Sequence, residues 1–193
     1  MGELEAGCFN RKVHRMGLNW VEDIVSDLYR LQGYLVLENE DLQMPKTEHR
    51  AIRGHSDIDV VAFRDGELVH VECQSWWGPA LADEEKQFRR LRARFEHAPE
   101  VIFERYPFLD RDKFQPRNVF VTSGRPKKSS GHGPWDRLQA FCDQNRIELV
   151  EINQVIRELI SALREKYPSQ QVVGREEGIA RFLLHLIFND FLK

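Results

Sequence analysis

The sequence predicts an α/β protein in which a mixed β-sheet is covered by helices on both faces. The first observation is a pair of apolar runs, residues 58–63 and 67–73, joined by Arg64-Asp65-Gly66. Asp-Gly between two apolar runs is a strong hairpin signal, so this part of the sheet should be antiparallel. The second observation is that strand-like and helix-like segments alternate after residue 118. That alternation indicates a parallel portion covered on both faces.

The individual elements follow from periodicity and from the residues that break it. Apolar residues recur at helical spacing between residues 21 and 31, and Gly33 is a suitable stop for that helix. The polar stretch 38–53 contains Pro45 and is expected to be a loop. In chain order, we predict helix 19–32, strand 34–37, strands 58–63 and 67–73, helix 81–97, a short helix at 101–106, strand 118–123, helix 135–145, strand 147–152, helix 153–166 and helix 176–192.

Length and composition indicate one principal domain in a globular protein. The chain has 193 residues, of which 41% are hydrophobic and 31% charged, so it can bury a sizeable core. We expect an extension over residues 1–18, the main domain over 19–167, and a linker with a helix over 168–193. The cysteines are Cys8, Cys73 and Cys142. Their odd number and the lack of Cys-x-x-Cys spacing indicate a reducing compartment.

Neither a membrane span nor a signal peptide is predicted. The most apolar late stretch, 179–188, is short and is interrupted by Arg181 and His185. The first five residues, Met-Gly-Glu-Leu-Glu, lack the basic and apolar regions of a signal peptide. We therefore expect a cytoplasmic protein without a membrane partner.

Acidic residues gather at one end of the predicted hairpin. Strand side chains alternate in direction, so Asp57 and Asp59 share one face, and Glu72 and Gln74 share another. Folding the hairpin can bring the acidic end of the first strand beside Glu72. Carboxylate oxygens gathered there suit a hard divalent cation such as Mg2+. His70 has the same parity as Glu72 and is either directed at this site or structural.

The spacing of these residues resembles that of a nuclease superfamily. In PD-(D/E)xK nucleases, an Asp is followed by Glu-x-Lys near the end of an apolar strand. Here Glu72-Cys73-Gln74 begins thirteen residues after Asp59. The surrounding sequence, GHSDIDVVAF and LVHVECQ, resembles the core of Mrr-like and Holliday-junction-resolvase-like members. The resemblance covers about residues 19–166 and implies a restriction endonuclease-like fold.

The resemblance also implies a set of site residues. Asp59 and Glu72, with the backbone carbonyl of Cys73, would hold Mg2+ or Mn2+, and Asp57 would complete or flank the site. Many members of the superfamily place a Glu on the first helix near the metal, and Glu22 matches that position. Glu22 also lies three residues after Asn19, so a capping box is the alternative role for it.

The lysine of the motif is replaced by Gln74, and this departure leaves two functions open. Some active restriction enzymes of the superfamily also carry Glu-x-Gln, so the resemblance still implies a Mg2+-dependent endonuclease that hydrolyses DNA phosphodiester bonds. A glutamine can hydrogen-bond a water molecule but carries no charge. A cation from elsewhere, such as Lys46 or Lys86, would then assist. The alternative is a catalytically inactive nuclease fold that binds nucleic acid or a protein partner.

DNA is the expected partner although the net charge is −3. Basic residues concentrate locally, and such patches supply phosphate contacts even in an acidic chain. The helix at 81–97 should carry Lys86, Arg90 and Arg94 on the face opposite its apolar residues. The candidate DNA-binding residues are Lys46, Arg53, Lys86, Arg90, Arg94, Arg125, Lys127 and Lys128. Association into a homodimer stays open.

Overall fold

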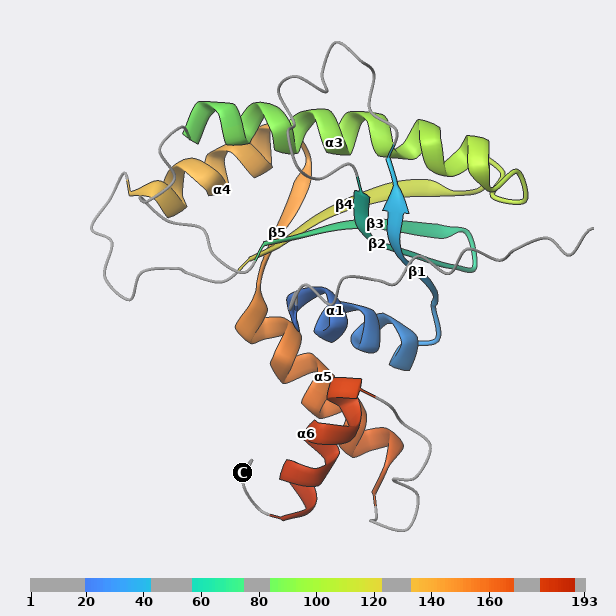
Figure 1. The fold of residues 1–193 in the computed structure, drawn as a ribbon, viewed down its shortest axis with the longest axis vertical. Helices are drawn as coiled ribbons and strands as arrows, with labels where there is room; N and C mark the ends of the chain where they lie inside the picture. The colour runs from blue at the N-terminus through green and yellow to red at the C-terminus, as the bar shows by residue number, and fades with distance from the viewer. Residues whose placement is uncertain (1–19, 43–56, 75–83, 123–132, 169–177, 190–193) are drawn as a thin grey trace, which may run out of the picture.

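A single five-stranded mixed sheet organises the molecule (Figure 1). The computed structural model describes residues 20–42, 57–74, 84–122, 133–168 and 178–189. The strands lie in the order β1-β2-β3-β4-β5, so spatial order follows chain order. A two-residue turn joins β2 to β3, whereas helices lie in the connections between the parallel strands.

The sheet is antiparallel in its first half and parallel in its second. Strands β1 (Leu35–Asp41), β2 (Asp57–Arg64) and β3 (Glu67–Gln74) pair antiparallel with one another. Strands β4 (Gln115–Thr122) and β5 (Ile147–Glu151) continue the sheet parallel to β3. Strand β3 therefore has an antiparallel neighbour on one side and a parallel neighbour on the other.

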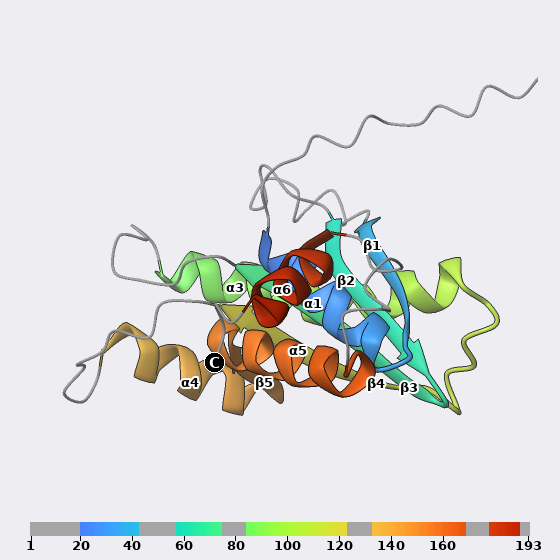
Figure 2. The same ribbon diagram turned by 90° about the horizontal axis from the view of Figure 1, so that it is seen from below.

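Helices cover both faces of the sheet (Figures 1 and 2). Helices α3 (Glu84–Arg105) and α4 (Pro134–Gln144) lie on one face. Helices α1 (Trp20–Leu31), α5 (Ile152–Lys166) and α6 (Gly178–Phe188) lie on the other. The predicted α/β class, a mixed sheet between two helical layers, is confirmed.

Each face of the sheet has its own apolar core because strand side chains alternate. On the α1 face, Val69, Val71 and Cys73 of β3 pack with residues of α1, α5 and α6. On the α3 face, Leu68 packs with Ala98 and Ile102 of α3, among others. The central strands are buried on both sides, which explains their nearly continuous apolar sequence.

Helix α3 is longer than the sequence predicts. It was expected to end at residue 97, with a separate short helix at 101–106, but it runs unbroken to Arg105 with Pro99 inside. Proline removes one backbone hydrogen bond and normally ends a helix. Here Ala98 and Ile102, on either side of Pro99, are both buried against the hairpin. That burial offsets the local cost, so tertiary packing prevails over the local signal.

Helix α6 packs against the main body of the molecule. Ala180, Leu183 and Leu184 are buried in the same core as α1 and α5. The backbone N–H of Ala180 donates a 3.0 Å hydrogen bond to the carboxylate of Asp27 on α1. The predicted division at residue 168 stays a prediction, but residues 178–188 share the core of the preceding elements. Among the described helices, none has the length and apolar character needed to cross a membrane.

Candidate active site at the end of the hairpin

The β2–β3 hairpin fixes which residues of the two strands face each other. Its turn is Asp65-Gly66, and both residues have positive φ, 49° and 87°, as a two-residue type I′ turn requires. The register runs from Arg64 opposite Glu67 to Val60 opposite Val71. Continued by one residue, this register sets Asp59 opposite Glu72. Residues opposite one another point to the same face, so both carboxylates face α3.

The Asp59 carboxylate is held by one group from each neighbouring element. Its Oδ2 accepts a 2.7 Å hydrogen bond from the backbone N–H of Cys73 on β3. Its Oδ1 accepts a 3.1 Å hydrogen bond from the Arg94 guanidinium on α3. Both oxygens of this carboxylate therefore have a partner within the protein.

The Glu72 carboxylate is engaged in the same way. Its Oε1 lies 2.7 Å from Nε2 of His70, and its Oε2 forms an ion pair with Nε of Arg94. The Arg94 guanidinium also donates a hydrogen bond to the backbone carbonyl of Asp57. Arg94 therefore contacts two carboxylates from neighbouring strands and, in addition, the backbone of Asp57 on β2.

Burial sets the ionisation of this acidic pair. Burial, and after it the nearby Glu72 carboxylate, raise the pKa of Asp59 to about 7 against the opposing effect of Arg94. Burial likewise raises the pKa of Glu72 to about 7, again against the influence of Arg94. The two carboxyl groups titrate together as one coupled pair close to neutral pH. Near pH 7 the pair can therefore both hold and release a proton.

His70 contacts the Glu72 carboxylate and stays uncharged. Its side chain is fully buried, and its ring lies 4.8 Å from that of Phe95 on α3. Burial, together with the Arg94 charge, lowers the pKa of His70 to about 3. A neutral imidazole has one N–H, and toward an ionised Glu72 carboxylate it donates from Nε2. Nδ1 is then an acceptor, and it is buried without a hydrogen-bond partner.

The site as it stands does not fit a divalent metal ion. Within the described ranges, no three His, Cys, Asp or Glu side chains are arranged to hold one. The four carboxylate oxygens of Asp59 and Glu72 are all taken by Cys73, His70 and Arg94. The donor chemistry suits Mg2+, but a guanidinium occupies the space between the two carboxylates.

The other predicted site residues divide between the two faces of the sheet. Gln74 ends β3 with its side chain half-buried, and alternation sets it on the Glu72 face. Glu22 lies on α1, close enough for its charge to help raise the pKa of Cys73, after burial and Asp59. Cys73 itself points into the α1-side core. Its side chain and Glu22 thus belong to the opposite face from Glu72.

The predicted basic residues divide into three groups. Arg94 was placed with Lys86 and Arg90 on an outer, DNA-facing side of the helix. Its side chain is instead only 15% exposed and is directed inward at Asp59 and Glu72. Lys86 is exposed and Arg90 half-buried on α3. Five residues lie outside the described residues: Lys46, Arg53, Arg125, Lys127 and Lys128.

The structural role of Arg94 was missed, although the sequence carried a signal for it. The buried face of α3 includes Leu91, Phe95 and Ala98. Arg94 follows Leu91 by three residues and precedes Ala98 by four, so helical periodicity sets it on that same face. An arginine within an apolar helical stripe needs a buried anionic partner. Asp59 and Glu72 are the acidic residues that meet this requirement.

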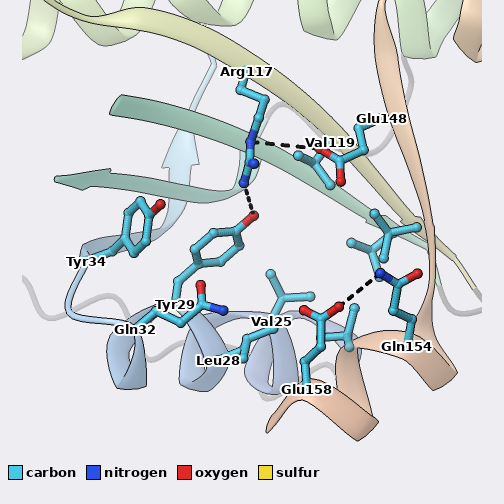
Figure 3. Close-up of a pocket in the computed structure, with 13 residues that line it drawn as sticks. Val25, Leu28, Tyr29, Gln32, Tyr34, Arg117, Val119, Glu148, Gln154 and Glu158 are labelled. Atoms are coloured by element: carbon cyan, nitrogen blue, oxygen red, sulfur yellow. Dashed lines mark hydrogen bonds and ion pairs between the residues drawn. The ribbon is translucent and has the colours of Figure 1, made fainter. Parts of the chain in front are cut away.

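A hollow lies on the opposite face of the sheet from the Asp59–Glu72 pair, between α1, α5 and strands β4 and β5 (Figure 3). Its volume is about 240 Å³, and valine side chains line much of it. At its rim, Arg117 donates a 3.2 Å hydrogen bond to the hydroxyl of Tyr29 and lies 3.9 Å from Glu148. Glu67 is a further acidic neighbour of Arg117, at 3.6 Å. The guanidinium is thus already engaged within the protein, and we assign no function to this hollow.

No protein-family model, no curated protein and no solved structure matches this chain.

Proposed function

We propose that this chain is a metal-dependent nuclease that hydrolyses DNA phosphodiester bonds at the Asp59–Glu72 pair. One observation carries the proposal: two carboxylates from adjacent strands share a single cation at the end of a hairpin. The residues are also those matched by the resemblance to PD-(D/E)xK nucleases.

The electrostatics of the pair suit hydrolysis near neutral pH. A general base works best when its pKa lies near the operating pH, and burial raises the pKa values of Asp59 and Glu72 to about 7. Of the two side chains, Asp59 is the more exposed, at 14% against 3%. Asp59 is therefore the better placed to accept a proton from an attacking water molecule.

The chain also supplies a cation that can recognise phosphate. A guanidinium binds phosphate oxygens in a bidentate manner as well as it binds carboxylates. Arg94 is held at the acidic pair rather than free at the surface. Lys86 on the same helix is exposed, and it is the described lysine that would supply the positive charge that Gln74 lacks. Mg2+ or Mn2+ is the proposed cofactor, and its chemistry would be to polarise the phosphoryl group and acidify a bound water.

A second candidate is a nuclease-like fold that binds nucleic acid or a protein partner without cleaving. Two observations favour it: the absence of a lysine at Gln74, and the engagement of all four carboxylate oxygens by protein groups. Under this proposal the acidic pair and Arg94 form a structural ion cluster. DNA would then bind, if at all, without a requirement for metal.

Cleavage of labelled linear, branched and single-stranded DNA, with Mg2+, Mn2+ or EDTA, separates the two candidates. The nuclease proposal requires cleavage by the wild type that EDTA abolishes and that Gln74→Ala reduces. Loss of a well-placed polar group in such a site typically costs about 3 kcal/mol, or ~100-fold in rate. Gln74→Lys should keep the wild-type cleavage rate or change it measurably, because it places a charge beside Asp59 and Glu72.

The remaining outcomes are equally specific. No cleavage by the wild type, with activity gained in Gln74→Lys, would favour the inactive fold. Metal-dependent cleavage that Gln74→Ala leaves untouched would remove residue 74 from the site. The matched control is Gln139→Ala on α4, an exposed glutamine hydrogen-bonded to Asp143, which should leave the rate unchanged.

A further inference from the structure

We propose that Arg94 and a divalent cation exclude one another at the Asp59–Glu72 pair, so that the site binds metal only after Arg94 has left it. The inference rests on the proposed function, since it concerns the metal of that same site. In addition, Arg94 would compete with the metal for the two carboxylates, a role that neither the acidic spacing nor the resemblance implies.

The first support is the way the carboxylate oxygens are used. Arg94 takes one oxygen of Asp59 at 3.1 Å and one oxygen of Glu72. One guanidinium contacts both of these oxygens at once, so a single cation in its place could contact both side chains. The other two oxygens are turned to groups that cannot leave: the N–H of Cys73 in the backbone and the buried ring of His70.

The second support is charge. Asp59 and Glu72 carry at most two negative charges, and Arg94 contributes one positive charge to the same small buried space. A divalent ion added beside Arg94 would reverse the sign of the cluster. Like charges repel strongly where water is scarce. The cluster is therefore balanced with either the guanidinium or the metal, but not with both.

The third support is that Arg94 has the means to move. It is a long, flexible side chain on a helix, whereas Asp59 and Glu72 are fixed by the pairing of β2 with β3. Its side chain is 15% exposed, so the arginine is not fully closed off from solvent. Arginine stems lie along apolar surface while the charged group reaches for water. A change of rotamer can thus release the carboxylates without disturbing the sheet.

Isothermal titration calorimetry with Mn2+ alone tests whether Arg94 and the metal exclude one another. If the released state is populated at about 1–10%, removing the guanidinium should tighten Mn2+ binding about 10- to 100-fold. We therefore expect Arg94→Gln to bind Mn2+ more tightly than the wild type by that factor. Arg89→Gln is the matched control, because Arg89 is an exposed arginine on the same helix. Its affinity should equal that of the wild type.

A second measurement uses the unaltered protein and so does not depend on the folding of a variant. Phenylglyoxal modifies accessible arginines, and mass spectrometry reads the extent at each residue. Saturating Mn2+ should increase modification of Arg94 and leave Arg89 unchanged. Glu72→Gln should abolish the Mn2+ effect, since it removes one of the two carboxylates.

The outcomes are distinguishable from those of the cleavage assay. Equal or weaker Mn2+ binding by Arg94→Gln, or Arg94 labelling that does not respond to Mn2+, would overturn the exclusion. If DNA is nevertheless cleaved, the nuclease proposal stands without it. Conversely, tighter Mn2+ binding by Arg94→Gln with no cleavage would keep the exclusion and defeat the proposed activity.

Discussion

The backbone N–H of Cys73 donates a 2.7 Å hydrogen bond to the side chain of Asp59. The paired register of β2 and β3 ends at Val60 and Val71, so this bond continues the link between the strands beyond the last paired residues. A side chain thus does here what a backbone carbonyl does elsewhere in the sheet. As a result, the orientation of Asp59 is set by the backbone of the strand that carries Glu72.

Replacing Asp59 should abolish stabilisation by metal. A ligand that binds only the folded state raises the free energy of unfolding, by about 2.7 kcal/mol at a hundred times its dissociation constant. We expect excess Mn2+ to raise the melting temperature of the wild type and of Asp112→Ala, which alters an exposed acidic residue. The shift should vanish in Asp59→Ala. Equal shifts in all three proteins would locate the metal elsewhere.

The buried His70 should make the protein sensitive to acid. Its pKa is lowered to about 3 in the fold and is about 6.5 when unfolded, so its stabilising effect is complete above pH 6.5 and is lost as pH falls toward 3. Asp59 and Glu72, whose pKa values are raised to about 7, act oppositely: their contribution is complete below about pH 4 and is lost as pH rises through 7.

The His70 effect can be separated by comparing two proteins at each pH. Urea unfolding in EDTA should give a free-energy advantage of the wild type over His70→Gln that shrinks by roughly 2 kcal/mol from pH 7 to pH 5. The carboxyl groups are common to both proteins, so most of their titration cancels. A difference that stays constant across this range would mean that His70 is not held neutral.

Helix α6 should contribute to the stability of the whole domain. Leu184 is fully buried, whereas Phe182 on the same helix is 59% exposed. Leu184→Ala should lower the free energy of unfolding by about 2–5 kcal/mol in a single transition. Phe182→Ala should change it by about 0.5 kcal/mol or less. If Leu184→Ala left the main unfolding transition unchanged, residues 178–188 would be a separate unit.

Basic residues of α3 should contribute to DNA binding through phosphate contacts. Each phosphate neutralised on duplex DNA adds about −0.9 to the slope of log K against log salt. Replacing Lys86 and Arg90 together by Ala should therefore flatten the slope by up to about 1.8. Arg157→Ala, on α5 at the other face of the sheet, is the control and should leave it unchanged. A slope unaffected by the double variant would exclude this surface.

The hairpin and its acidic end could be predicted because their signals are local. Asp65-Gly66 sets the turn, and the strand register that follows from it brings Asp59 and Glu72 to the same end of the hairpin. The partner of these carboxylates could not be read so directly. Arg94 is separated from Asp59 by 35 residues, and its charge, taken together with Lys86 and Arg90, predicts an outward position that its place in the helical period does not support. Long-range pairing of this kind depends on how α3 packs, which local patterns do not contain.

The type I′ turn at Asp65-Gly66 has a consequence for how this sequence can vary. Because strand side chains alternate with a period of two, inserting or deleting one residue at the turn would rotate one strand's set of side chains to the opposite face. Asp59 and Glu72 would then lie on different sides of the sheet, and Arg94 would lose one of its two carboxylates. A side chain at Gly66 would also meet the carbonyl of Lys113, 3.2 Å from the added carbon. The two turn residues therefore determine the alignment of Asp59 with Glu72, although they lie at the other end of the hairpin. The length of this loop should tolerate less change than the surface around it.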